Sequence, residues 1–186
     1  MNEIEITNGA LSVKTATRGN SIELGEEVEG YYASADTTKK LTIHSSDEVP
    51  LFFGIEGKLF GAAKIGFDEI QTKSLLASLR ASLVAYGLNV KDIKATIGPC
   101  LTFSHCPVER KVIEKLLSDG YQAAAKRTDG VDFLDLPVFV LLELRRLGVE
   151  MENIKIGDYD TFENPDLLYS KLRGEKEENP STASLS

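Results

Sequence analysis

The segment that decides the fold is Ser46-Asp47-Glu48-Val49-Pro50, followed a few residues later by Gly61-Ala62-Ala63-Lys64-Ile65-Gly66-Phe67. Between the ends of this segment lie two apolar runs, 51–55 and 59–63, and Glu56-Gly57-Lys58 separates them. Short apolar runs on either side of a glycine-containing turn are typical of two paired strands. The sequence therefore predicts a β-hairpin here.

Composition and charge limit the class of protein. The chain has 186 residues, of which 42% are hydrophobic and 27% charged, and this suits one compact domain. The net charge of -8 disfavours binding to a nucleic-acid backbone, and no apolar run is long enough to cross a membrane. The acidic amino terminus lacks a signal-peptide pattern. We therefore expect a cytoplasmic protein with no nucleic-acid or membrane partner; its oligomeric state stays open.

Local patterns predict the remaining elements. Further strands are expected at 4–6, 11–13, 21–24, 28–33, 41–44, 92–97 and 153–156. Helices are expected at 69–86 after the cap Asp68 (with Leu76, Leu79, Leu83 and Tyr86 on one face), at 107–118, at 137–147 and from Asn164. Strands and helices are mixed without strict alternation, so the predicted fold class is α+β, with a mixed β-sheet and packed helices.

The predicted domain ends before the carboxyl terminus. Residues 1–174 are expected to form a single domain. Residues 175–186 are polar and are expected to form a mobile tail, with a final short strand at 183–185 as an option.

Several motifs occur in the order of a known family. Asp47 and Pro50 match an Ala-Asp-Cys-x-Pro motif, and Gly61-Ala62-Ala63 and Gly66 match a Gly-Ala-Ala-His-Ala-Gly-Trp-Arg-Gly motif. Ile97-Gly98-Pro99 and Leu134-Asp135-Leu136 follow in the same order. From Ala35 onward the chain thus resembles the laccase-domain family, also described as multicopper polyphenol oxidoreductases or purine nucleoside phosphorylases. The resemblance implies a laccase-domain, cysteine-hydrolase-like fold. It also implies phosphorolysis of purine nucleosides or, in some members, deamination of adenosine.

The chain departs from the family at the zinc positions. Typical members bind zinc through two histidines and a cysteine. Here Glu48 replaces the motif cysteine, Lys64 replaces the motif histidine, and the late Cys-Thr pair reads Asp160-Thr161. A lysine ammonium has no lone pair to offer a metal. We therefore expect no zinc cofactor, and an ion pair between Lys64 and Glu48 in its place.

The resemblance implies a remodelled catalytic site at these positions. In an altered enzyme, Lys64 would bind phosphate or a leaving group, Glu48 or Asp47 would act as acid or base, and His44 would lie beside them. A structural ion pair and a turn aspartate are the simpler interpretations of the same residues.

His105 and Arg173 are candidates for binding the substrate. Arg173 stands where the family has one of two late arginines, and an exposed helix arginine is the simpler interpretation.

The two cysteines and two histidines allow further alternatives. Cys100, Cys106, His44 and His105 could form a metal site, or Cys106 could be a nucleophile with either histidine as its base. The Cys-x5-Cys spacing is not that of a standard zinc knuckle, and isolated cysteines usually pack as small apolar groups. A multicopper centre would need more histidines than the two present.

Two functions follow from these residues. The first is a divergent enzyme that acts on purine nucleosides, with a nucleoside or phosphate as its small-molecule partner and without the usual zinc. The second is a non-catalytic homologue that binds a nucleotide-like ligand or another protein through the remodelled cleft.

Overall fold

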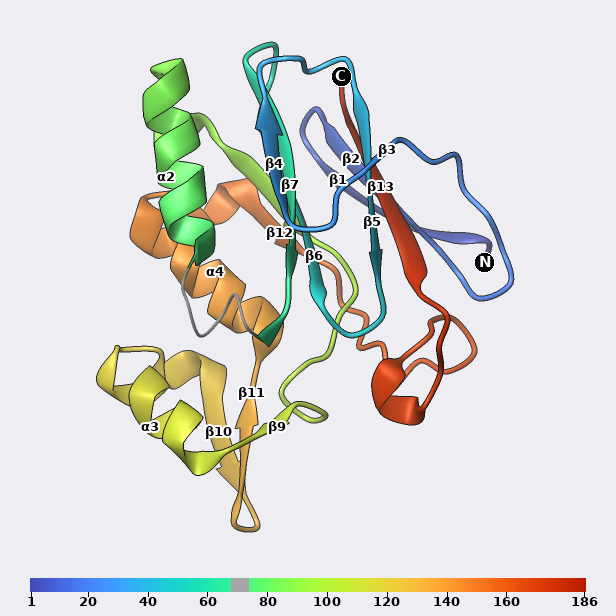
Figure 1. Ribbon diagram of the computed structural model, residues 1–186, viewed down its shortest axis with the longest axis vertical. Coiled ribbons are helices and arrows are strands. Elements are labelled where there is room, and N and C mark those ends of the chain that lie inside the picture. The colour runs from blue at the N-terminus through green and yellow to red at the C-terminus, as the bar shows by residue number, and fades with distance from the viewer. Residues whose placement is uncertain (68–73) are drawn as a thin grey trace.

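Two five-stranded sheets face each other, and helices cover the far side of one of them (Figure 1). The computed structural model describes residues 1–67 and 74–186, apart from the side chain of Leu76; the predicted cap Asp68 lies outside this part. The first sheet has the order β1-β2-β13-β5-β3, with bounds Glu3–Asn8, Leu11–Ala16, Asn179–Leu185, Lys40–Ser45 and Glu26–Glu27. The second has the order β12-β8-β6-β7-β4, with bounds Ile154–Ile156, Lys94–Ile97, Val49–Ile55, Leu59–Ile65 and Tyr31–Ser34.

The predicted hairpin forms the centre of the second sheet. Strands β6 and β7 pair antiparallel from Ile55 and Leu59 at the turn to Val49 and Ile65 at the open end. Gly57 has a φ of 64°, a conformation that glycine adopts without steric cost, and this explains the tight turn. All seven residues of β6 are buried, because the sheet is covered on both faces.

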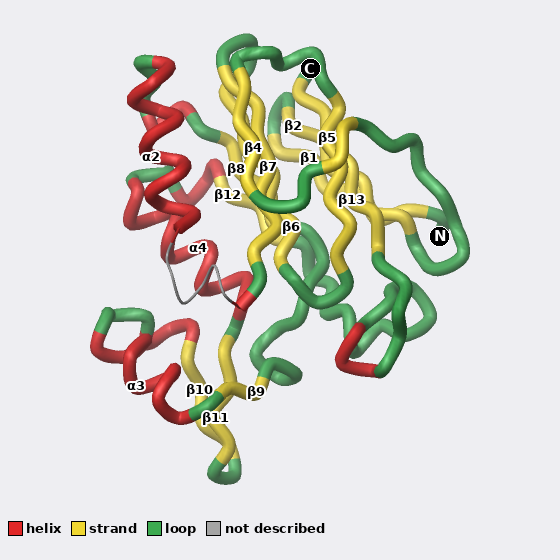
Figure 2. The backbone as a smooth tube through the Cα atoms, viewed as in Figure 1, coloured by secondary structure: helices red, strands yellow, loops and turns green. Residues whose placement is uncertain are grey.

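The two faces of this hairpin build two cores. Phe52, Phe60 and Ala62 point toward the first sheet, where they meet apolar residues of β2, β5 and β13. The alternate residues point to the other face and pack against α2 (Ser74–Tyr86) and α4 (Leu136–Leu147). Leu79 and Leu83 of α2 are buried there as predicted, whereas Tyr86 is exposed. Figure 2 shows α2 and α4 along this side of the sheet.

A small lobe extends beyond the two sheets. It consists of α3 (Arg110–Ser118) and a three-stranded sheet in the order β10-β11-β9, with bounds Ala125–Thr128, Val131–Leu134 and Pro107–Val108. The helix predicted at 107–118 therefore begins later than expected, because its first two residues pair with β11 as a strand. The hairpin of β10 and β11 was not predicted from the sequence.

Helix α4 has the limits that the sequence predicts. Asp135 accepts a hydrogen bond from the Val138 backbone N–H at 3.1 Å and so caps the first turn. Pro137 lies in that turn, and Gly148 ends the helix with a φ of 111°. These signals are local, and they correctly set both ends.

Further predictions differ from the structure. Residues 21–24 form an irregular loop, and β3 begins only at Glu26. The residues after Asn164 form turns, and the nearest helical segment is the short 3-10 helix η4, Lys171–Arg173. The optional strand at 183–185 is confirmed, but it begins already at Asn179 as β13. This is a central strand whose residues are mostly buried between β2 and β5, so the expectation of a mobile tail is wrong for residues 179–185. No helix in the described part of the chain has the length and apolar character needed to span a membrane.

Candidate functional site

Lys64 lies near the open end of the β6–β7 hairpin and points toward the first sheet. It pairs in register with Pro50 and shares a strand face with Phe60 and Ala62. Its ammonium Nζ donates to Glu178 Oε1 at 3.4 Å, and only 16% of its side chain is exposed. Glu178 directly precedes β13, so the carboxyl-terminal segment supplies the counter-ion of Lys64.

Glu48 belongs to the same end of the hairpin but has another partner. Lys171 of η4 donates from Nζ to Glu48 Oε1 at 3.0 Å and also lies 3.4 Å from Glu178 Oε1. Glu48, Lys171, Glu178 and Lys64 thus form a continuous sequence of alternating charges, which we call the four-residue ion-pair chain. The predicted direct pair between Lys64 and Glu48 is wrong, because side chains from η4 and the start of β13 lie between them.

The Glu48 carboxylate is held in its charged form. Burial by itself would raise its pKa, but the hydrogen bonds from Lys171 and from backbone N–H groups of this turn outweigh it. The backbone N–H of Ser46 donates to Glu48 Oε2 at 3.2 Å. Together these contacts lower the pKa of Glu48 to about 2. The group is therefore ionised at neutral pH and serves as an acceptor.

Asp47 ties three segments of the chain together. Its Oδ1 accepts from the Thr161 hydroxyl at 2.8 Å, and its Oδ2 accepts from the backbone N–H of Leu172 at 2.8 Å. Its backbone carbonyl accepts from the N–H of Leu101 at 3.2 Å. Both carboxylate oxygens are therefore engaged in contacts within the protein.

Arg173 is not the exposed helix arginine that the simpler interpretation predicts. Only 15% of its side chain is exposed. Its guanidinium donates to the carbonyls of Thr161, Phe162 and Leu168 and to Glu175 Oε2. A planar guanidinium with several donors suits this task, and the contacts fasten the turns at 161–168 to η4.

His44 lies on a different face from Lys64. It shares a face of β5 with Lys40 and Thr42, whereas Leu41 and Ile43 point into the core between the sheets. The His44 ring therefore stands on the outer side of the first sheet, where Nε2 lies 3.6 Å from Glu27 Oε1. The structure does not bring His44 to the other predicted site residues.

His105 faces a fixed aspartate. Its Nδ1 lies 3.5 Å from Asp160 Oδ2 and 3.7 Å from Glu163 Oε1, and its ring stacks on Phe162 with the centroids 4.5 Å apart. Asp160 also accepts from the hydroxyl and backbone N–H of Thr102 at 2.6 and 2.8 Å. Burial opposes ionisation of Asp160, but these hydrogen bonds prevail and lower its pKa.

His105 and its partners Asp160, Phe162 and Glu163, which we call the His105 cluster, are linked to the ion-pair chain through Asp47, the residue before Glu48. Thr161, whose hydroxyl holds Asp47, directly follows Asp160 in sequence, so the two groups share one loop. Lys171, Glu178, Phe162 and Glu163 were not among the predicted site residues. The sequence held no local signal for them, because they gain their partners only when remote segments meet.

Both cysteines are buried in the helix-covered core as free thiols. Burial, reinforced by nearby carboxylates including Asp47, raises the pKa of Cys106 to about 11 and raises that of Cys100 well above its usual value. Neither thiol is hydrogen-bonded to a histidine in the described residues, so the proposed nucleophile–base pair is not assembled. A thiol of this kind is a poor nucleophile at neutral pH.

The residues at the family's zinc positions do not fit a zinc ion. One of them is an ammonium already paired with a carboxylate, and it cannot act as a ligand. Across residues 1–67 and 74–186, no three or more His, Cys, Asp or Glu side chains are grouped so that they could hold a metal ion. The two-Cys, two-His alternative is therefore not formed in this part of the chain.

Comparison with known proteins now gives the class of this protein. The family model described as multi-copper polyphenol oxidoreductase laccase matches residues 10–182, so the chain belongs to that family. This confirms the resemblance drawn from the motifs. No match was found among curated proteins.

Solved structures share the fold. The protein YfiH of Bacillus licheniformis has a TM-score of 0.74 at 22% identity over 84% of this chain, and YlmD of Geobacillus stearothermophilus has 0.75 at 19% identity over 84%. The chain covers only 61% and 60% of these two proteins. Neisseria meningitidis protein NMB0706, of the DUF152 family, has a TM-score of 0.79 at 14% identity over the full length of both chains. The likeness confirms the predicted α+β laccase-domain fold.

Proposed function

We propose that this protein is a non-catalytic member of the laccase-domain family that binds a purine-nucleoside-like ligand without cleaving it and without zinc. The observation that carries the proposal is the four-residue ion-pair chain. It fills the positions of two family zinc ligands with charges that satisfy one another. A site of this kind supplies no Lewis acid to polarise a substrate or activate water.

Asp47 and Arg173 are also engaged within the protein. An acid or base must reach the proton that it transfers, and both oxygens of Asp47 already accept hydrogen bonds from the chain. The Arg173 guanidinium donates its hydrogen bonds to backbone carbonyls and to Glu175. These contacts favour structural roles for the residues that, in an enzyme, would do the chemistry.

Binding without turnover is supported by the neighbouring aromatic pair. His105 and Phe162 stack on each other, so a purine would stack on the outward face of the pair. Lys171, whose side chain is 49% exposed, lies in the nearby ion-pair chain. The expected ligand contacts are therefore His105, Phe162 and Lys171.

The alternative is a divergent purine nucleoside phosphorylase-like enzyme. One observation favours it: Asp160 faces Nδ1 of His105, as an orienting carboxylate does behind a general base. In this version Lys171, which is more exposed than Lys64, would be the phosphate-binding cation.

A combined activity and binding assay separates the two. Purified protein is incubated with adenosine or inosine and inorganic phosphate, free base is followed by chromatography, bound zinc is measured by elemental analysis, and inosine binding is followed by two-dimensional NMR. We expect shifts of amides near His105 and Lys171, no released base and no stoichiometric zinc.

The variants Lys171→Ala and His105→Ala should weaken inosine binding, whereas Lys58→Ala in the exposed β6–β7 turn should not. Release of hypoxanthine that Lys171→Ala or His105→Ala abolishes and Lys58→Ala preserves would establish the enzyme. An absence of inosine-dependent shifts would refute the binding proposal.

A further inference from the structure

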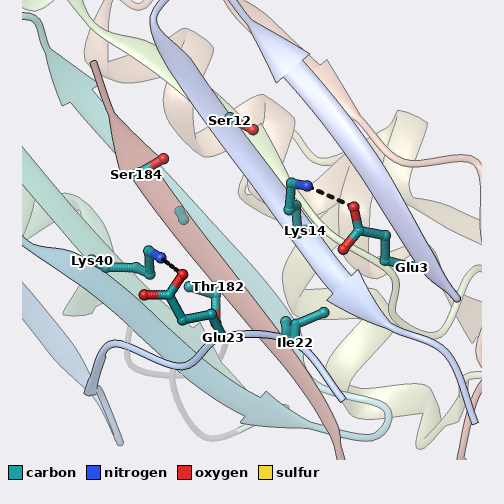
Figure 3. Close-up of a pocket in the computed structure, with 9 residues that line it drawn as sticks. Glu3, Ser12, Lys14, Ile22, Glu23, Lys40, Thr182 and Ser184 are labelled. Atoms are coloured by element: carbon teal, nitrogen blue, oxygen red, sulfur yellow. Dashed lines mark hydrogen bonds and ion pairs between the residues drawn. The ribbon is translucent and has the colours of Figure 1, made fainter. Parts of the chain in front are cut away.

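A polar cavity lies on the outer face of the first sheet, away from the ion-pair chain. Its floor consists of outward-pointing side chains of β2, β13 and β5, and residues 20–25 pass over it (Figure 3). Its volume is about 240 Å³. An apolar cavity of roughly 150 Å³ is enough for benzene, so this one accommodates a six-membered ring with substituents.

The register of the sheet places the lining groups in two rows. Thr182 of β13 pairs with Lys14 of β2, and Ser184 pairs with Ser12 on one side and Lys40 on the other. Because neighbouring strands are about 4.8 Å apart, the strands that carry the two lysines are separated by about 10 Å. Hydroxyl groups therefore occupy the space between two ammonium groups.

The segment over the cavity is fastened at both ends. At one end Gly25 donates its backbone N–H to the Thr42 hydroxyl at 2.7 Å, and a Cβ at Gly25 would lie only 2.0 Å from the Lys40 carbonyl oxygen. At the other end the backbone N–H of Asn20 donates to the Thr17 carbonyl at 2.9 Å. Only glycine allows the close approach at 25, so the cavity has a fixed wall.

The charges of the cavity cancel. Lys14 pairs with Glu3 at 2.6 Å, and Lys40 pairs with Glu23 at 2.7 Å. A singly charged ligand would have to displace one member of a pair and leave the other without its counter-ion. A neutral ligand leaves both pairs intact, so the electrostatics favour a neutral molecule.

The remaining groups indicate what kind of neutral molecule. Carboxylates accept hydrogen bonds, ammonium groups donate them, and serine hydroxyls do both, so the lining matches a ligand rich in hydroxyl groups. The Ser184 hydroxyl has no hydrogen-bond partner among the described residues and is open to a ligand. The wall contributes Ile22 as an apolar contact, and none of the described lining side chains is aromatic, so there is no stacking surface for a nucleobase.

We propose that this cavity is a binding site for a neutral, polyhydroxylated molecule of monosaccharide size. The ligand's hydroxyl groups would bond to Ser184, Ser12 and the two lysine–glutamate pairs, and its C–H face would contact Ile22. None of the residues that line this cavity belongs to the ion-pair chain or contacts His105, so the cavity is independent of the proposed nucleoside site.

The test is a titration of the full chain by two-dimensional amide NMR with D-glucose, D-galactose, D-mannose and D-ribose, each alone. At least one sugar should cause saturable shifts at residues 12–14, 22–23 and 182–184 and leave His105 unchanged. Ser184→Val and Lys40→Met should each weaken that binding roughly tenfold, as expected for the loss of one polar contact to the ligand. Lys58→Met in the distant β6–β7 turn is the matched control and should leave affinity unchanged.

Three outcomes would overturn the proposal. One is that none of the four sugars produces saturable shifts at these residues. Another is that inorganic phosphate or succinate binds there more tightly than any sugar, which would mark an anion site. The third is that a sugar binds equally well to the wild type and to both cavity variants while far-UV circular dichroism shows that they are folded. If Ser184→Val does not fold, Glu23→Gln on the exposed segment replaces it and carries the same expectation.

Discussion

Removing the charge of Glu48 tests whether the ion-pair chain stabilises this fold. In the folded protein the pKa of Glu48 is about 2, compared with an ordinary value of 4.5. Folding thus favours the carboxylate form. Its contribution to stability is fully present above about pH 4.5 and is lost as the pH falls from 4.5 toward 2. Glu48→Gln, which keeps the shape of the side chain, should remove this contribution at neutral pH.

The size of the effect follows from the same values. A pKa lowered from 4.5 to about 2 corresponds to at most about 3.4 kcal/mol, at 1.36 kcal/mol per pKa unit. The Glu48 side chain is 24% exposed and its partner Lys171 49%, so solvent screening reduces the expected loss to about 1–2 kcal/mol. For a chain of this length that is a fall in Tm of about 2–8 °C.

Urea unfolding of the wild type and Glu48→Gln at several pH values measures the difference directly. We expect a gap of about 1–2 kcal/mol at pH 7 that narrows steadily below pH 4.5. Glu56→Gln, in the exposed β6–β7 turn, is the matched control and should unfold like the wild type at pH 7. Equal stability of Glu48→Gln and the wild type at pH 7, or a gap that widens in acid, would refute the reasoning.

Three further predictions follow from the described contacts. Arg173→Ala should lower the free energy of unfolding, measured in urea, by about 3 kcal/mol, because several carbonyls lose a charged donor. Arg173→Lys should restore less than half of that loss. A loss below about 0.5 kcal/mol for Arg173→Ala would show that Arg173 does not fasten the turns at 161–168 to η4. Deleting residues 179–186 should abolish the native far-UV circular dichroism spectrum, because β13 is the middle strand of its sheet, whereas deleting Ser186 alone should not. Cys100 and Cys106 should react with a thiol reagent at pH 8 only after denaturation, because burial raises the pKa of both; rapid reaction of either in the native protein would disprove this.

Much of the fold could be predicted because its signals are local. The β6–β7 hairpin follows from two apolar runs around Gly57, and the limits of α4 follow from Pro137 and Gly148. Only the last three residues of strand β13 were predicted, because the strand consists mainly of small and hydroxyl-bearing residues and therefore resembles a solvated tail. Two of its buried hydroxyl groups find partners across the sheet: the Ser181 hydroxyl bonds to Thr15 and the Thr182 hydroxyl to Thr42, each at 2.8 Å.

The sequence alone determined the family and the fold class, because these depend on residue identity and order along the chain. The tertiary structure alone decided the partners of Lys64 and Glu48. Their counter-ions come from 114 and 123 residues further along, in segments with no feature that points to the hairpin. An ion pair depends on distance in space, and that distance exists only once η4 and β13 have packed beside β6 and β7.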